Sequence, residues 1–187
     1  SLEKALYEDN VPFGVYDNLL TAVGDNLKYV HEYVALRKET LGYDKLHMYD
    51  MYVPIVENAE SEYDFETAFD MVVKGLAPLG EEYRELLLRS RSERWMDVFE
   101  TENKRSGAYS WGSYGTHPYV LLNHSNTTHD VFTIAHELGH AMHSYYSHGA
   151  QPHSKANYSI FVAEVASTVN EVLLLKYMIS HATDKKA

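Results

Sequence analysis

The chain has 187 residues, of which 45% are hydrophobic and 23% are charged. This length and composition suit a folded protein with its own core and argue against a disordered, collagen-like or coiled-coil chain. The 16 basic residues are outnumbered by 27 acidic ones, so the net charge is −11, which argues against binding to the phosphate backbone of nucleic acids.

The sequence contains no cysteine. This excludes disulfides and thiolate metal sites, and it favours a reducing compartment such as the cytoplasm. No apolar run approaches the length of a membrane span, and the N-terminal segment lacks the basic and apolar regions of a signal peptide. We therefore expect a cytoplasmic protein without membrane contact.

The N-terminal half is predicted to be helical. Apolar residues recur every three to four positions over 15–41 and again over 62–90, with one break at a proline and a glycine. Residues 1–93 are therefore expected to form a helical packing region. His31 and His47 have no second ligand at helical spacing, and we expect them to be ordinary surface or core residues.

Glycine, serine and aromatic residues dominate the next segment, 94–124. Residues 119–123 follow Pro118 and read as a short strand. We expect a small sheet to interrupt the helices here.

A further helix is predicted to start at Thr127, whose side chain can cap it while the Asp130 carboxylate returns to the first turn. It should run to about His148, because Gly149 suits a left-handed cap and Pro152 forbids continuation.

A last helix is predicted to begin near Ser159. Two of its faces differ in character. One is an apolar stripe of Phe161, Val165, Val169 and Val172. The other carries Glu164, Thr168, Glu171 and Leu175.

The segment His136-Glu137-Leu138-Gly139-His140 lies inside the first of these two helices. Residues four apart share a helical face, so both imidazoles can bind one ion at about 2.0 to 2.1 Å, as in zinc sites. Glu137 is offset by about 100° around the helix, where it can reach a water at the metal and act as general base. The motif predicts half of a catalytic zinc site.

Such a site needs a third protein ligand, and three residues compete for the role. His143 lies about 10 Å of helix axis from His136, so the three histidines cannot close on one ion; we expect it to pack or to support the site. Glu164 lies on the polar face of the next helix, which can fold back on the first, and a His-His-Glu site follows. Glu171, on the same face, is the remaining rival, and we expect it to orient a ligand histidine or a neighbouring side chain.

Three stretches resemble oligoendopeptidase F, a member of the thimet-oligopeptidase-like zinc metallopeptidases. They are GAYSWGSYGTHPYVLLN at 107–123, AHELGHAMH at 135–143 and YSIFVAEVASTVNE at 158–171. The match covers at least 94–180, and MYDMYVP at 48–54 is similar as well.

The resemblance implies a mainly α, zincin-type catalytic region, with a deep channel and a small β-sheet next to the His-Glu-x-x-His helix. It implies one zinc ion per chain, held by His136, His140 and Glu164, with Glu137 as general base. Short unstructured peptides would be cleaved by a metal-activated water. The strand at 119–123 would lie along the cleft edge, where an extended peptide can add backbone hydrogen bonds.

Family members also carry, well downstream of the third ligand, a segment with histidine and tyrosines that donates to the tetrahedral intermediate. This chain ends before such a segment. We therefore expect 1–187 to be a single piece of a larger catalytic domain, with the zinc-site region at 94–187, and to be weakly active or inactive alone. His153 and Tyr158, which connect the ligand-bearing helices, are expected to be structural or to contact substrate.

Two alternatives stay open. A metal- or peptide-binding module would keep the site without turnover, and a Glu137→Gln comparison separates it from an enzyme. A non-peptidase zinc hydrolase would use the same ligands, although the stretch at 107–123 argues against it.

Overall fold

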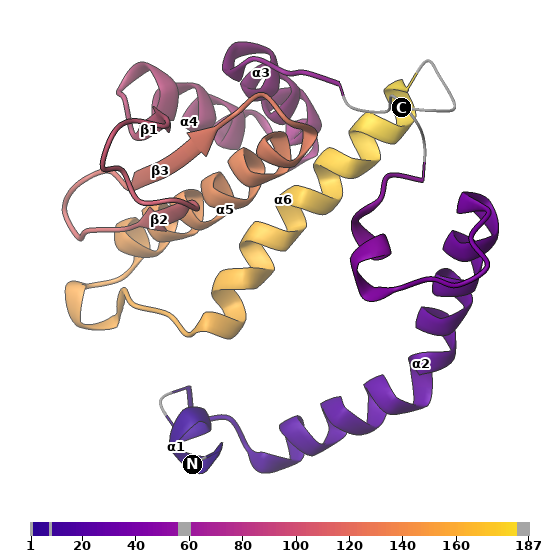
Figure 1. Cartoon of the computed structure of the whole chain (residues 1–187). Coiled ribbons are helices and arrows are strands. Elements are labelled where there is room, and N and C mark those ends of the chain that lie inside the picture. The colour runs from indigo at the N-terminus through magenta and orange to yellow at the C-terminus, as the bar shows by residue number, and fades with distance from the viewer. Residues whose placement is uncertain (1, 8, 56–60, 183–187) are drawn as a thin grey trace. The chain divides into compact units, whose positions relative to one another are not determined.

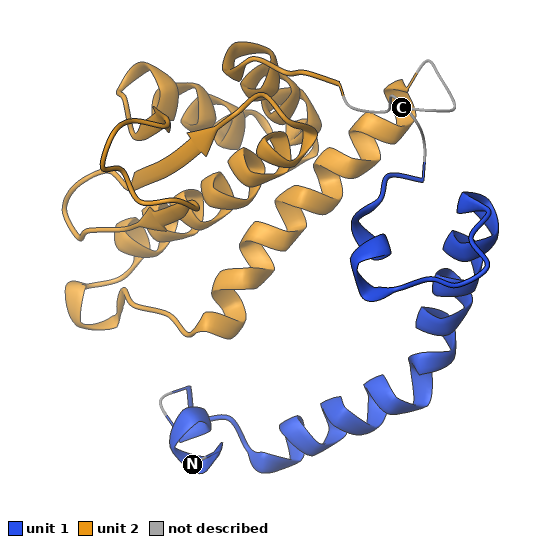
Figure 2. Ribbon diagram, in the orientation of Figure 1, with its two compact units in different colours: residues 1–59 blue, residues 60–187 orange. Residues whose placement is uncertain are grey.

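The computed structural model describes residues 2–7, 9–55 and 61–182. The chain divides into two compact units, residues 1–59 and 60–187 (Figures 1 and 2). Helices α3 (Phe65–Gly75) and α4 (Glu81–Ser92), which belong to the N-terminal helical region of the sequence, lie in the second unit.

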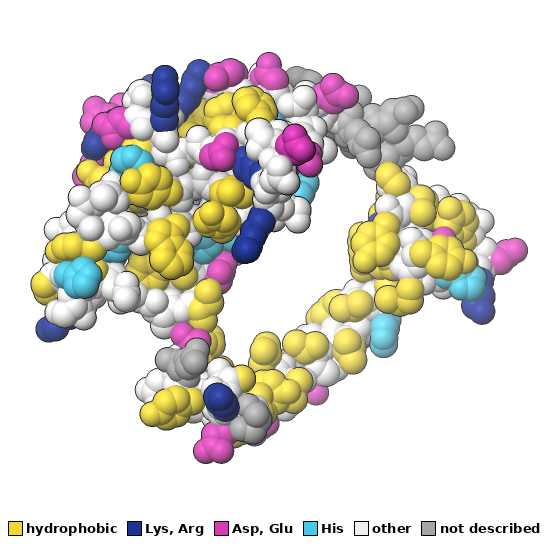
Figure 3. Space-filling view, turned by 60° about the vertical axis from the view of Figure 1, so that its left-hand side comes forward, with side chains coloured by type: hydrophobic (Ala, Val, Ile, Leu, Met, Phe, Trp, Pro, Cys, Tyr) yellow, Lys and Arg dark blue, Asp and Glu magenta, His cyan; other side chains and the backbone are white. Residues whose placement is uncertain are grey.

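Unit 1 is built on one long helix. Its elements are α1 (Leu2–Tyr7), α2 (Phe13–Leu41) and the 3-10 helix η1 (Met48–Tyr52). The helix expected over 15–41 is thus confirmed. Hydrophobic side chains, most of them exposed, follow α2 along much of its length (Figure 3).

The buried residue of α2 is Arg37. Its guanidinium donates to the main-chain oxygens of Asp50, at 3.2 Å, and Val53. These bonds hold the segment around η1 against the helix, because a buried guanidinium needs acceptors for its hydrogens.

Unit 2 contains the remaining helices and all described strands, and the mainly α fold with a small sheet is confirmed. No helix in the described ranges has the length and apolar character needed to cross a bilayer. The elements of unit 2 are α3 (Phe65–Gly75), η2 (Ala77–Leu79), α4 (Glu81–Ser92), β1 (Met96–Phe99), β2 (Tyr109–Trp111), β3 (Tyr119–His124), α5 (Thr128–Ala150), η3 (His153–Lys155) and α6 (Ile160–His181).

The sheet has the strand order β1-β3-β2. β3 pairs in parallel with β1 and antiparallel with β2, so Val120 lies opposite both Met96 and Ser110. The strand predicted at 119–123 is confirmed, but its expected place along the cleft edge is wrong. Because β3 pairs on both sides, its backbone groups are used within the sheet, and β2 is the strand with a free edge on the side of the antiparallel pair.

Helix α5 is the central element of unit 2. It contacts β2 and β3, and it also contacts α3 and α6 (Figure 1). A helix covered on several sides buries residues around most of its circumference. Those of α5 are Val131, Ile134, Ala135, Glu137, Leu138, Gly139, Ala141, Met142 and Ser144.

The start of α5 is the predicted capping box. The backbone N–H of Asp130 donates to Thr127 Oγ1 at 3.2 Å, and Asp130 Oδ2 accepts from the N–H of Thr127 at 2.9 Å. The end differs from the prediction, since Gly149 lies inside the helix and the cap is Gln151 in an extended conformation. The proline at 152 disfavours the helical conformation only for the residue directly before it, so the helix can continue through Gly149.

Candidate metal centre

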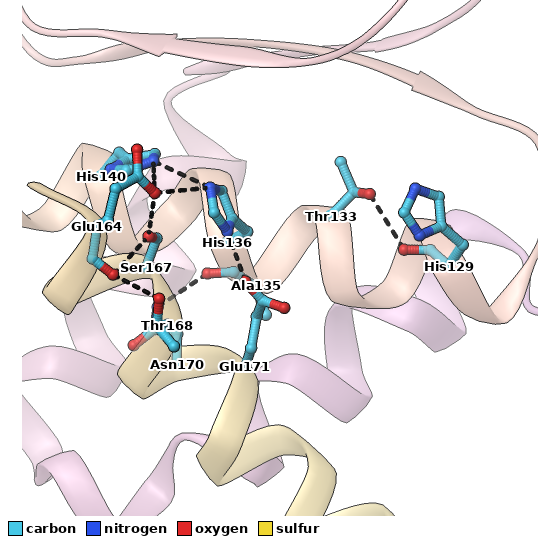
Figure 4. A network of polar contacts seen from close by, with 10 residues as sticks. All are labelled: His129, Thr133, Ala135, His136, His140, Glu164, Ser167, Thr168, Asn170 and Glu171. Atoms are coloured by element: carbon cyan, nitrogen blue, oxygen red, sulfur yellow. Dashed lines mark hydrogen bonds and ion pairs between the residues drawn. The ribbon is translucent and has the colours of Figure 1, made fainter. Parts of the chain in front are cut away.

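Helices α5 and α6 bring three metal-binding side chains together. His136 and His140 lie on one face of α5, and their Nε2 atoms are 3.0 Å apart. Glu164, in the first turns of α6, places Oε2 at 3.6 Å from the first nitrogen and 3.7 Å from the second (Figure 4). The three atoms therefore face one common point.

These distances fit one bound zinc ion. Two atoms that each bind zinc at about 2.0 to 2.1 Å can lie at most about 4 Å apart, and all three pairs satisfy this limit. Burial lowers the pKa of His140, and the charge of His136 lowers it further. The neutral imidazole is the form that binds a metal ion.

A second carboxylate contacts one of the histidines on its other ring nitrogen. Glu171, on α6, has Oε1 at 2.6 Å from Nδ1 of His136 (Figure 4). A hydrogen bond at Nδ1 favours the tautomer that carries its proton there, which leaves the Nε2 lone pair for a metal. Glu171 therefore lies at the Nδ1 side of His136 and Glu164 at its Nε2 side.

Glu137 is buried, and its Oε2 has no hydrogen-bond partner in the described structure. Burial raises the pKa of this carboxyl; the nearby His136 acts in the opposite direction and Glu164 adds to the increase. A cavity of about 270 Å³ lies beside Glu137, His136 and Glu171. A buried carboxylate that lies beside a cavity can accept a proton from a water that reaches it.

A larger cavity, of about 580 Å³, adjoins the other two residues of the candidate metal centre. His140 and Glu164 line it together with Ser110, Trp111 and Gly112 from the edge strand β2 and the residue after it. Strand β2 and the candidate metal centre therefore line one cavity.

The remaining candidates lie farther along α5 and in its connection to α6. The ring of His143 stacks on that of Tyr158, with centroids 3.8 Å apart, and burial lowers its pKa. The Tyr158 hydroxyl is 2.6 Å from Ser144 Oγ, and this tyrosine lines the cavity of His140 and Glu164. His153 is exposed and packs edge-on against Tyr114.

The face of α6 that packs in unit 2 is neither of the two faces distinguished in the sequence. The apolar stripe is exposed, with relative exposures of 43–60%. The buried residues are Ala163, Ser167, Asn170 and Leu174. They follow one another at steps of four, three and four, which is the repeat of one helical face.

Two polar residues of this buried face support the centre. Asn170 Nδ2 donates to the main-chain oxygen of Ala135 at 2.9 Å, and its Oδ1 accepts from Tyr83 at 3.1 Å. Ser167 Oγ contacts the Glu164 carboxylate. Sequence reasoning missed both residues, and their spacing of three and six residues from Glu164 was the available signal.

The sequence of this chain is similar to those of known peptidases. A model of peptidase family M3 matches residues 1–187. Oligopeptidase PepF of Bacillus subtilis is 49% identical over 184 residues, which cover 98% of this chain and 28% of that protein. An oligoendopeptidase F homolog of Borreliella burgdorferi is 42% identical over 181 residues, with 96% of this chain and 31% of the relative covered.

Solved structures have the same fold. A crystal structure described as a peptidase from Chlamydophila abortus superposes with a TM-score of 0.84 and 44% identity, over 99% of this chain and 31% of that one. One described as an oligoendopeptidase F from Bacillus anthracis gives a TM-score of 0.81 at 19% identity, over 94% and 33%. The chain thus spans about a third or less of these proteins.

Proposed function

This chain belongs to peptidase family M3, and from that premise we propose that it carries the zinc site of an endopeptidase that cleaves short unstructured peptides. The resemblance to oligoendopeptidase F in its sequence is confirmed by its relatives. The observation that carries the proposal is the convergence of His136 Nε2, His140 Nε2 and Glu164 Oε2 on one point.

We assign the three converging residues as ligands of one zinc ion per chain. Their two nitrogens and one oxygen are the donor set typical of a zinc site that keeps one position open for chemistry. A zinc ion bound there supplies Lewis-acid chemistry, polarising a carbonyl group and making water more acidic. Glu171 holds the proton on His136 Nδ1, so that Nε2 keeps its lone pair.

Glu137 is assigned as the general base. Its unpartnered Oε2 takes a proton from the attacking water and passes it to the leaving amine nitrogen. Burial, which raises its pKa, favours the neutral carboxyl that must form between the two transfers.

The peptide itself is proposed to bind along β2. An edge strand offers unpaired backbone N–H and C=O groups, and an extended peptide can pair with them. Ser110 and Trp111 of this strand line the cavity of His140 and Glu164, so a peptide bound there passes the ligands. The peptide-binding edge is therefore β2 instead of β3.

We propose further that these residues are one piece of a larger catalytic domain, because the chain spans 28% and 31% of the two relatives. Weak or absent activity of the 187-residue chain alone, and its cytoplasmic location, stay predictions. Because the chain spans only part of these relatives, one alternative remains: a fragment that binds metal or peptide without turnover.

Two variants test the proposal. Glu164→Ala should reduce the zinc content of the chain sharply, while Glu100→Ala, at an exposed position after β1, should leave it unchanged. Metal analysis of the purified proteins decides this. An unchanged zinc content in Glu164→Ala would show that Glu164 is not the third ligand, and Glu171 would be the next candidate.

Glu137→Gln separates an enzyme from a binding module. In the longer protein it should keep its zinc while hydrolysis of a quenched-fluorescence peptide falls by about 10² to 10⁴, because the amide cannot accept the water proton. Wild-type turnover in this variant would remove Glu137 from the mechanism. A wild-type protein that binds zinc and peptide without cleaving it would be a binding module.

A further inference from the structure

Ser167 lies behind the carboxylate of the proposed third ligand. It is one helical turn after Glu164 on α6 and has no exposed surface. Its Oγ is 3.1 Å from Glu164 Oε2, the same oxygen that faces the Nε2 atoms of both histidines (Figure 4). The hydroxyl therefore touches the atom that we assign to the metal.

The donor and acceptor of this hydrogen bond follow from the chemistry of the two groups. A carboxylate oxygen only accepts hydrogen bonds, so the serine hydroxyl is the donor. Its one hydrogen is shared between Oε2 and the main-chain oxygen of Glu164, which lies 3.0 Å from Oγ. The side chain of Glu164 is 48% exposed, and a half-exposed glutamate has several rotamers to choose from. A donor fixed inside the helix interface selects the rotamer in which Oε2 faces the histidines.

The packing around Ser167 explains why the residue is small. The backbone of α5 passes so close that a Cβ atom on Gly139 would lie 2.7 Å from Ser167 Cα. A larger side chain at either position needs the helices to separate. Alanine would satisfy the packing equally well. The hydroxyl is therefore explained by its two acceptors, the carboxylate and the main-chain oxygen of Glu164, and Thr168, which donates to the same main-chain oxygen, controls for the second of them.

We infer that Ser167 is a positioning residue for the metal-binding carboxylate of Glu164, an inference that rests on the proposed metal site. Partners that hydrogen-bond to metal ligands fix the orientation of those ligands, and their removal commonly costs about 10 to 100-fold in metal affinity. Ser167 acts through Glu164 and touches neither substrate nor metal.

Ser167→Ala removes the hydroxyl and keeps the packing, and alanine is the best helix former. Thr168→Ala is the matched control, because Thr168 is exposed and its Oγ1 donates to the main-chain oxygen of Glu164, at 2.6 Å. Zinc affinity of the 187-residue chain is measured by competition with a chromophoric chelator. Co²⁺ loading gives visible absorption bands that report the ligand geometry, and thermal unfolding of the metal-free proteins reports packing.

We expect Ser167→Ala to bind zinc about 10 to 100-fold more weakly than wild type, with altered Co²⁺ bands and an unchanged metal-free unfolding midpoint. Thr168→Ala should match the wild type in affinity and bands. The inference is overturned by wild-type affinity and bands in Ser167→Ala, or by a loss of affinity that is matched by a lower metal-free midpoint. If the wild-type chain binds no zinc, or if Glu164→Ala binds zinc with wild-type affinity, the proposed site itself is wrong and the inference fails with it.

Discussion

Gly139 lies directly against the backbone of Ser167. A Cβ atom on this glycine would be 2.7 Å from Ser167 Cα and 2.9 Å from the carbonyl oxygen of Ala166. The glycine stands between the two histidines on α5, and Glu164 precedes Ser167 by one turn on α6. This contact therefore sets the distance between the histidine pair and the carboxylate.

Gly139→Ala should push the two helices apart. The backbone atoms that it meets cannot rotate away, so we expect overpacking to cost about 1 to 3 kcal/mol of unfolding free energy, reduced by up to about 1 kcal/mol from the better helix propensity of alanine. Zinc affinity should fall as well, because Glu164 moves with α6. Urea unfolding and zinc competition measure the two effects.

Gly149 provides the matched control on the same helix. A Cβ atom there would meet nothing within 4 Å, so Gly149→Ala should raise the free energy of unfolding by up to about 1 kcal/mol and leave zinc affinity unchanged. Equal effects of the two substitutions would show that the contact with Ser167 is unimportant.

Glu171 should tune zinc affinity through His136. Loss of such a partner commonly costs about 10 to 100-fold in affinity, and we expect Glu171→Ala to fall in this range. Glu171→Gln keeps an oxygen that can accept from Nδ1 but carries no charge, so its loss should be smaller. Competition with a chelator gives both values. An alanine variant with wild-type affinity would contradict the role assigned to the 2.6 Å contact.

Asp130 should make the start of α5 sensitive to acid. Partial burial by itself raises the pKa of this carboxyl, but hydrogen bonds from Thr127 and Ser125 outweigh it and hold the pKa below its usual value. A carboxyl whose pKa is lower in the folded state adds stability above its unfolded pKa of about 3.9, and this stability is lost as pH falls through the folded value.

We therefore expect Asp130→Asn to destabilise unit 2 by about 1 kcal/mol at pH 7, as for the loss of other helix caps. The difference from wild type should shrink as the pH falls below about 4. Urea unfolding of both proteins over this pH range measures it. A difference that is constant with pH would mean that the charge of Asp130 has no part in the cap.

Local rules of sequence were sufficient for most elements of this protein. The predicted capping box of Thr127 and Asp130, the helix over 15–41 and the strand at 119–123 depend on neighbouring residues, whose preferences can be read directly. The end of α5 was misplaced because a glycine permits a left-handed cap without requiring one. Proline at 152 was the residue that ended the helix.

The pair His136 and His140 was likewise visible in the sequence, because a spacing of four places two side chains on one helical face. The sequence also favoured Glu164 as the third ligand and Glu171 as a residue that orients a histidine or a neighbouring side chain, but it could not give their geometry. Glu164 and Glu171 lie on one face of α6, and only the packing of α6 on α5 puts the first at Nε2 and the second at Nδ1 of His136.

That packing runs through the face of Ser167 and Asn170, while the apolar stripe of α6 is exposed. Hydrophobic periodicity indicates which face of a helix gains free energy from burial. How closely two helices approach depends instead on small residues that lie opposite each other on the two helices. Gly139 and Ser167 are 28 residues apart, and no local pattern relates them. Only the tertiary structure brings them into contact, because the contact depends on how α6 packs on α5. The same packing places the Glu164 carboxylate beside the histidines.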